Sequence, residues 1–231
     1  VSLGGFVQPG TIPKPLAIGR AGRLLLGVGA LFYVAWLIFE RDALIWTSGI
    51  DQEFSQVFDS GDDFEQITAA RSSENFNAND TNDFDDGAPD NLDSRSDNKG
   101  PEPESVVVGE IDGRTFAFVG LERVGGIMVY DVSDPHSPSF DTYVNRRDFS
   151  QPNTIMVSQD PPVFDPDTEE EILVEITNPA VGDLAVEGLK FVKAEDSPTG
   201  NPLLVTANEV SGTTTIFEIQ DGSGSLGAPV V

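Results

Sequence analysis

The fold is decided by residues 104–132, which read ESVVVGEIDGRTFAFVGLERVGGIMVYDV. Runs rich in valine, isoleucine and phenylalanine predict three strands, at residues 106–111, 115–121 and 127–132. Asp112-Gly113 separates the first two runs and is a strong hairpin signal, because both residue types tolerate positive φ angles. The stretch therefore predicts an antiparallel unit of short strands that are joined by tight turns.

A partial copy of this pattern follows near the C-terminus, where residues 186–219 read VEGLKFVKAEDSPTGNPLLVTANEVSGTTTIFEI. Aligning the two units places Glu104 on Glu187 and Glu122 on Glu209. The separation along the chain between the equivalent glutamates of the two units corresponds to roughly two propeller blades of about 40–45 residues each. Two similar hairpins in a β-sandwich would produce the same echo. The four glutamates either direct their carboxylates into a propeller channel or bond turn amides, and the sequence leaves both alternatives open.

We therefore expect a mainly β fold, namely a partial β-propeller-like array of blade-type antiparallel sheets preceded by one N-terminal transmembrane helix. The expected parts are an irregular N-terminal segment at 1–20, the transmembrane helix at 21–46, an acidic Asn/Asp-rich loop region at 47–103, and a β domain with two blade-like repeats at 104–231. A short helix is also predicted at 64–71, inside the loop region.

The transmembrane prediction depends on residues 24–39, LLLGVGALFYVAWLIF, which carry no charge. As a helix this run would be about 24 Å long, slightly short of a hydrocarbon core of about 30 Å. Extension of the helix over residues 21–46 makes a single-pass signal anchor the favoured interpretation. A cleaved signal peptide and a buried core helix are the alternatives. The candidate anchor residues are Leu24, Phe32, Tyr33, Trp36, Phe39 and Trp46.

Charge is distributed unevenly along the chain, whose formal net charge is −26. Basic residues prevail before and around the apolar run, and acidic residues prevail after it. This asymmetry predicts a cytoplasmic N-terminus and a periplasmic or extracellular C-terminal domain, held in the cell membrane by a single pass. The acidity excludes a general nucleic-acid binder, because phosphate binding needs clustered Lys and Arg. The expected partners are the lipid bilayer, through residues 21–46, and a larger membrane-protein complex.

Calcium is the one cofactor for which the sequence offers ligands, although no EF-hand pattern is complete. Calcium takes six to eight oxygen ligands, which Asp and Asn side chains supply. A solvated acidic loop is the alternative interpretation of the same residues. The candidate metal ligands are Asp80, Asp83, Asp85, Asp86 and Asp90.

Four stretches together resemble a known family. They are DSGDDFEQITAAR at 59–71, FDDGAPDNLDSRSDNKG at 84–100, the strand-rich segment that continues to 135, and residues 184–219. Through these stretches the chain resembles, over residues 55–219, the C-terminal part of the choice-of-anchor I domain. That family is similar to the MSP130-type mesenchyme-specific surface glycoproteins. The resemblance implies an extracytoplasmic, β-propeller-like domain, often at cell surfaces. Some members are labelled atypical alkaline phosphatases or linked to biomineralisation, but no catalytic residue set carries over. Ser105 stands where the family usually has glycine.

Several catalytic and metal chemistries are excluded by composition. The chain has no cysteine and one histidine, His136, so zinc sites of the His/Cys type and cysteine nucleophiles are absent. Residues 104–231 hold fewer blades than the roughly four of a closed propeller. We therefore expect a non-catalytic accessory or scaffold subunit that docks on a larger membrane-protein assembly. A calcium-binding cell-surface protein and a fragment of a metal-dependent phosphoesterase are the alternatives.

Overall fold

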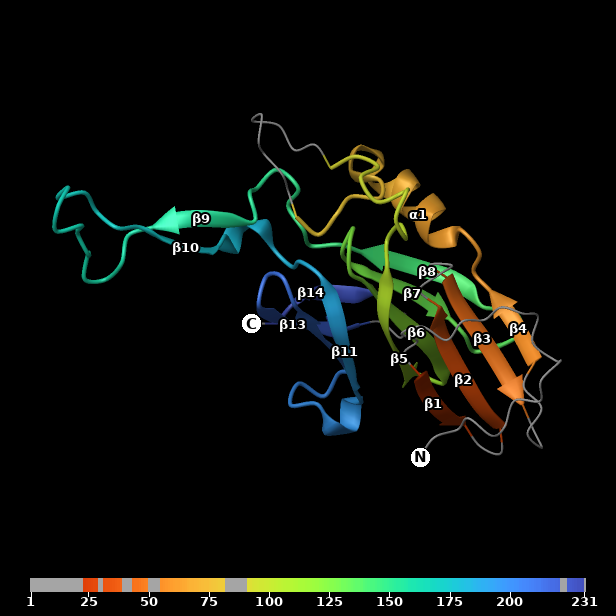
Figure 1. The fold of residues 1–231 in the computed structure, drawn as a ribbon. Helices are drawn as coiled ribbons and strands as arrows, with labels where there is room; N and C mark the ends of the chain where they lie inside the picture. The colour runs from red at the N-terminus through yellow and green to blue at the C-terminus, as the bar shows by residue number, and fades with distance from the viewer. Residues whose placement is uncertain are drawn as a thin grey trace, which may run out of the picture.

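The computed structural model describes residues 23–28, 31–38, 43–49, 55–81, 91–220 and 224–230. Within them the chain is mainly β, and three four-stranded antiparallel sheets each follow the order of the sequence (Figure 1). The first sheet contains β1 (Arg23–Val28), β2 (Leu31–Ile38), β3 (Ala43–Gly49) and β4 (Ser55–Asp59). The second contains β5 (Pro103–Ile111), β6 (Arg114–Leu121), β7 (Ile127–Asp131) and β8 (Ser139–Val144). The third contains β11 (Val186–Val192), β12 (Leu203–Asn208), β13 (Thr213–Ile219) and β14 (Leu226–Pro229).

Shorter elements connect these sheets. Strands β9 (Thr154–Val157) and β10 (Val174–Thr177) form a separate two-stranded sheet between the second and third sheets in the chain. Helix α1 (Asp63–Arg71) confirms the helix predicted at 64–71 and follows β4 directly. Three short 3-10 turns complete the described elements: Ser73–Asn75, Pro179–Val181 and Ala194–Asp196.

The second sheet is central and is buried on both faces. Side chains alternate between the two faces of a strand, and on β6 Phe116 and Phe118 belong to one core cluster while Ala117 and Val119 belong to the other. The first cluster includes Leu204 and other residues of the third sheet. The second lies against β4 and α1. This burial on both faces explains why the decisive stretch is almost continuously apolar.

Tyr130 of β7 joins the central sheet to α1. Its ring contacts the rings of Phe64, Phe58 and Phe140, with centroid separations of 6.1, 6.4 and 5.9 Å. Its hydroxyl donates to a carboxylate oxygen of Asp63 over 3.2 Å. The ring contact with Phe64 and the hydrogen bond to Asp63 thus hold α1 on the sheet.

The predicted hairpin at Asp112-Gly113 is confirmed. Both residues have positive φ angles, 50° and 78°, as a type I′ turn requires. Strands β5 and β6 pair up to this turn, where Ile111 lies opposite Arg114. The strongest local signal in the sequence therefore sets the register of the central sheet.

The predicted transmembrane helix at 21–46 is wrong, because this part of the chain forms β1, β2 and β3. Among the described residues, no helix combines the length and the apolar character needed to cross a membrane. Leu24 lies in β1, Trp46 lies in β3, and Phe32, Tyr33 and Trp36 lie in β2. Phe39 lies outside the described residues.

The physical reason lies in strand pairing. Leucine, valine and aromatic residues suit helices and buried strands alike, so a short apolar run has no period that separates the two. Its internal glycines each cost a helix about 1 kcal/mol relative to alanine. Strand β2 pairs with β1 on one side and with β3 on the other, so its backbone groups bond across the sheet. The expected fold class, a partial propeller behind a transmembrane helix, is therefore corrected to a set of antiparallel sheets, and its mainly β character is confirmed.

Candidate functional site: a glutamate cluster shared by two sheets

The two sequence repeats become two sheets with the same backbone irregularity at the same place. In the second sheet the strand register shifts between Pro103 and Ser105, which makes Glu104 the extra residue of a β-bulge. In the third sheet the register shifts between Val186 and Gly188, and the extra residue is Glu187. A bulge redirects the side chain of its extra residue. Equivalent β-bulges thus direct the side chains of both glutamates.

The residues around the two bulges also match. Glu102 and Ala185, each two residues before a bulged glutamate, have positive φ angles of 48° and 58°. Each of their carbonyl groups accepts a 2.8 Å hydrogen bond from the backbone N–H of the glutamate that follows the neighbouring strand, Glu122 or Glu209. Each repeat therefore places one glutamate in a bulge and one beside it.

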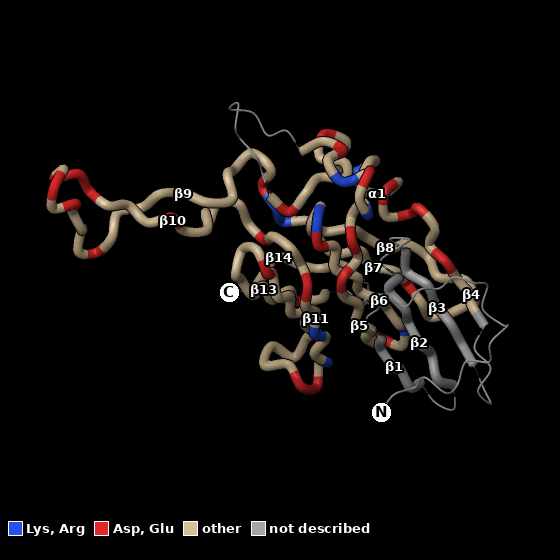
Figure 2. Tube along the Cα trace, viewed as in Figure 1, with Lys and Arg blue, Asp and Glu red and all other residues tan. Residues whose placement is uncertain are grey.

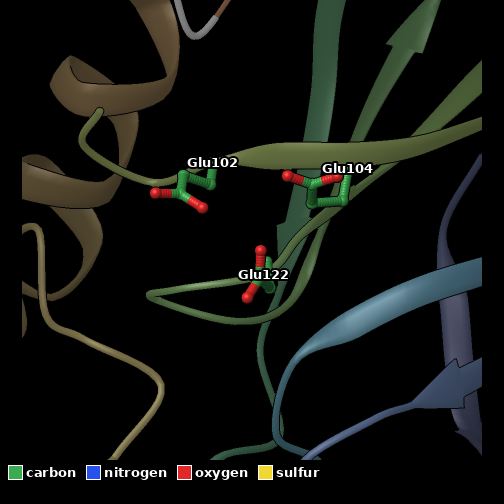
Figure 3. A group of neighbouring side chains, drawn as sticks. All are labelled: Glu102, Glu104 and Glu122. Carbon is green, nitrogen blue, oxygen red and sulfur yellow. The ribbon is translucent and has the colours of Figure 1, made fainter. Parts of the chain in front are cut away.

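The matched glutamates meet because β11 lies alongside β5 (Figure 1). Carboxylate oxygens of Glu102, Glu104 and Glu122 all lie within 4.8 Å of one another. The same is true of Glu122, Glu187 and Glu209, so Glu122 belongs to both triads. Figure 3 shows the side chains of Glu102, Glu104 and Glu122 directed toward a common space. We call these five residues the glutamate cluster.

One side of the glutamate cluster is neutralised by arginine. Arg123 forms ion pairs with Glu102 over 3.1 Å, with Glu122 over 2.9 Å, and with Asp80. Arg95 donates to Glu102 over 2.5 Å. Burial opposes the ionisation of Glu102, but the hydrogen bond from Arg95 and the charge of Arg123 outweigh it, and the pKa of Glu102 is lowered.

The carboxyl groups of Glu104, Glu122 and Glu187 are held in a setting that favours their protonated form. Burial, together with the charges of Glu102 and Glu187, raises the pKa of Glu104 to about 7. Burial raises the pKa of Glu122 to about 7 as well, since the carboxylates of Glu102 and Glu104 oppose the effect of Arg123. Burial and the neighbouring Glu209 raise the pKa of Glu187. Crowded carboxylates of this kind need a proton or a cation to remain together.

The cluster is also reachable from solvent. Glu102 and Glu122 are buried, Glu104 is half-buried, and Glu187 and Glu209 are exposed. Five carboxylates supply the hard oxygen donors that Ca²⁺ and Mg²⁺ prefer. The cluster thus runs from buried to exposed carboxylates, an arrangement that suits reversible uptake of a small cation from water.

Of the five calcium ligands predicted in the acidic loop, the structure describes Asp80 alone. Asp80 is committed to an ion pair with Arg123. Asp83, Asp85, Asp86 and Asp90 lie outside the described residues, so the proposed role of this loop in calcium binding stays a prediction. His136 lies exposed in its turn, where its backbone N–H donates to Asp134 over 3.0 Å.

Sequence reasoning found four members of the cluster and missed the fifth. It noted Glu104, Glu122, Glu187 and Glu209 as equivalent positions, and the structure brings their carboxylates together. Glu102 escaped notice because Ala185 occupies its position in the second repeat, so the repeat carries no signal for it. Arg123 was missed for the same reason, since Val210 is its counterpart.

Comparison with known proteins matches the resemblance seen in the sequence. The model of the choice-of-anchor I domain family matches residues 42–135, which include Glu102, Glu104 and Glu122. Gigasin-3a of Magallana gigas is 28% identical over 176 residues, which cover 76% of this chain and 55% of that protein. A mesenchyme-specific cell surface glycoprotein of Strongylocentrotus purpuratus is 42% identical over 45 residues, 20% of this chain and 6% of that protein. The chain thus spans about half the length of the first relative and a small part of the second.

Proposed function

We propose that this chain is a non-catalytic, accessory β domain of a protein displayed at the cell surface, and that its glutamate cluster binds a divalent cation. The surface location is supported by similarity to the choice-of-anchor I domain and to a relative described as a cell surface glycoprotein. The observation that carries the cation proposal is the pair of carboxylate triads that share Glu122.

The charge balance of the cluster supports cation binding, because the arginines compensate only some of its carboxylates. In the described part of the chain, Arg95 and Arg123 form ion pairs with Glu102 and Glu122, whereas no Lys or Arg forms one with Glu104, Glu187 or Glu209. A divalent ion would offset two of the three negative charges in this second group. Calcium is the favoured ion, because it accepts irregular sets of oxygen ligands more readily than Mg²⁺ does.

The role of the ion would be structural. Its ligands come from both the second and the third sheet, so a bound cation would link the two across the contact between β5 and β11. Ligand binding to the folded state alone stabilises that state. Calcium would therefore set the rigidity of the domain at the cell surface.

Calorimetry with the purified chain and CaCl₂ at pH 8 and pH 6 tests this proposal. We expect saturable binding at pH 8 and weaker binding at pH 6, because the carboxyl groups of Glu104 and Glu122, with pKa values near 7, must lose their protons to act as ligands. Glu122→Gln should abolish binding, since Glu122 belongs to both triads. Glu187→Gln, at an exposed position, should weaken binding by about tenfold.

Glu110→Gln is the matched control, because Glu110 lies exposed on the same strand as Glu104 but outside the cluster. Circular dichroism of each variant checks that the fold is retained. The absence of heat from Ca²⁺ at millimolar concentration and pH 8, or equal binding by wild type and both cluster variants, would overturn the proposal.

A further inference from the structure

The β9–β10 hairpin and its tip project from the body of the molecule. We call residues 152–178 the arm. Figure 1 shows it extending away from the three sheets. Within the described residues, β9 pairs with β10 and with no other strand. An isolated two-stranded hairpin is marginally stable in water, so packing against another surface would stabilise an element of this kind.

Hydrogen bonds close the base of the arm and tie it to the body. Asn178 is buried, and its side-chain amide donates to the carbonyl of Pro152 over 2.9 Å. Its backbone N–H donates to the carbonyl of Asn153 over 2.8 Å. Asn153 in turn donates to the carbonyl of Asp80 over 3.0 Å. The arm therefore leaves the body from a defined point.

Exposed apolar side chains are concentrated on the arm. Phe164 and Met156 have exposed fractions of 57% and 56%, values that are unusual for large apolar residues. Six of the eight large apolar residues exposed in the described part of the chain lie on the arm, and two lie elsewhere. The six are Met156, Val163, Phe164, Ile172, Leu173 and Ile176. Clustered exposed apolar surface marks an interaction site.

The charge on the arm has a single sign. Residues 148–189 contain no Lys, Arg or His. Figure 2 shows acidic positions along the arm and around its tip, with no basic position among them. They are Asp160, Asp165, Asp167, Glu169, Glu170, Glu171 and Glu175. Apolar side chains are thus interspersed with carboxylates over the whole projection.

We propose that the arm docks on a partner protein whose surface offers an apolar patch flanked by Lys and Arg. The apolar side chains would be buried against the patch, and the carboxylates would face the basic rim. Complementary charge steers association and selects the partner. A second copy of this chain is disfavoured as the occupant, because the chain carries a net charge of −26 and the arm itself is acidic. This inference does not depend on cation binding at the glutamate cluster.

Site-specific photo-crosslinking tests the inference on the full chain in its native cellular setting. The probe is p-benzoylphenylalanine in place of Phe164, and the matched control is the same probe in place of Leu92, an apolar residue 55% exposed on the body. We expect one protein to be captured from position 164 and not from position 92. The crosslinked peptide should map to an apolar patch bordered by Lys and Arg.

Binding of the purified partner then provides the quantitative test. Replacing Asp165, Asp167, Glu169, Glu170 and Glu171 with their amides should weaken binding by about tenfold or more, and raising NaCl from 50 to 500 mM should do the same. Phe164→Ser should weaken binding without changing the melting temperature of the body. Glu122→Gln should leave binding unchanged, which separates this test from that of the cation proposal.

Three results would overturn the inference. They are the absence of any crosslink from position 164, a crosslink to a second copy of this chain or to lipid, and a captured surface without basic residues. Binding of the purified partner that is indifferent to both the amide variant and salt would also contradict it.

Discussion

The second and third sheets share a backbone device and differ in the charges placed on it. Both carry a positive-φ residue, a bulged glutamate and a second glutamate bonded back to the first strand. The second sheet adds an acid at Glu102 and a base at Arg123, where the third sheet has Ala185 and Val210. A backbone irregularity repeated in two adjacent sheets gathers carboxylates at one place, because β11 lies alongside β5. The side chains that neutralise them were placed in one repeat alone.

The largest expected effect comes from breaking this asymmetry at Arg123. Arg123→Met removes ion pairs to Asp80, Glu102 and Glu122, and among the described residues it leaves Arg95 as the ion-pair partner of the buried Glu102. We expect a loss of about 2–3 kcal/mol in the free energy of unfolding, because uncompensated buried carboxylates are costly. Urea denaturation at pH 7.5 measures it.

Val210→Met is the control for Arg123→Met, since it makes the same side chain at the equivalent position of the other repeat. It should change the free energy of unfolding by less than about 0.5 kcal/mol. Equal losses from the two substitutions would show that Arg123 acts through packing and not through its charge.

A change of pH is expected to have an intermediate effect on the stability of the folded chain. The pKa values of Glu104 and Glu122 are raised to about 7 in the folded chain, above the ordinary value of 4.5. The folded state then binds protons more tightly than the unfolded state, so stability falls as pH rises from about 4.5 to about 7 and changes little above that. Allowing for solvent screening, we expect about 1–2 kcal/mol over this window. Melting temperatures at half-unit intervals of pH, in the presence of a chelator, measure it.

The double variant Glu104→Gln and Glu122→Gln should flatten this part of the pH profile. Glu110→Gln should leave it as it is in the wild type. A wild-type profile that rises between pH 5 and pH 7 would contradict the raised pKa values and the crowding from which they arise.

The smallest effect concerns Ser105, whose counterpart in the other repeat is Gly188. The hydroxyl of Ser105 is buried and makes no hydrogen bond to the described residues. Ser105→Ala should therefore raise stability by about 0.5–1 kcal/mol, because it removes an unsatisfied polar atom. Gly188→Ser should lower stability, since a Cβ there lies 3.1 Å from the Cβ of Ala207. Thermal denaturation of the two variants compares them, and destabilisation by Ser105→Ala would contradict this account.

Much of the local structure was predictable. The Asp112-Gly113 turn carries its own φ requirement, so the β5–β6 hairpin followed from two residues. The run at 64–71 became α1, and the echo between 104–132 and 186–219 became two sheets of the same strand order. In each case the information lies within a few residues along the chain.

The N-terminal apolar run shows where local information ends. Residues 24–39 have the apolarity expected of a membrane helix and nearly its length, and nothing in their spacing opposes one. Their assignment to β1 and β2 depends on partners, since β2 is bonded on both sides. Strand pairing therefore decided the structure of this run, and its apolar composition did not.

By itself, the sequence determined three of the four strands of the central sheet and the turn between the first two, the acidity of the chain and the four equivalent glutamates, because turn chemistry, composition and repetition are properties of local sequence. Tertiary structure alone decided that β11 lies beside β5, that bulges direct Glu104 and Glu187 into one cluster, and that Glu102 and Arg123 join it. These outcomes depend on contacts between segments far apart in the chain. A carboxylate acquires a raised pKa or a cation only when other charges and apolar groups are brought around it.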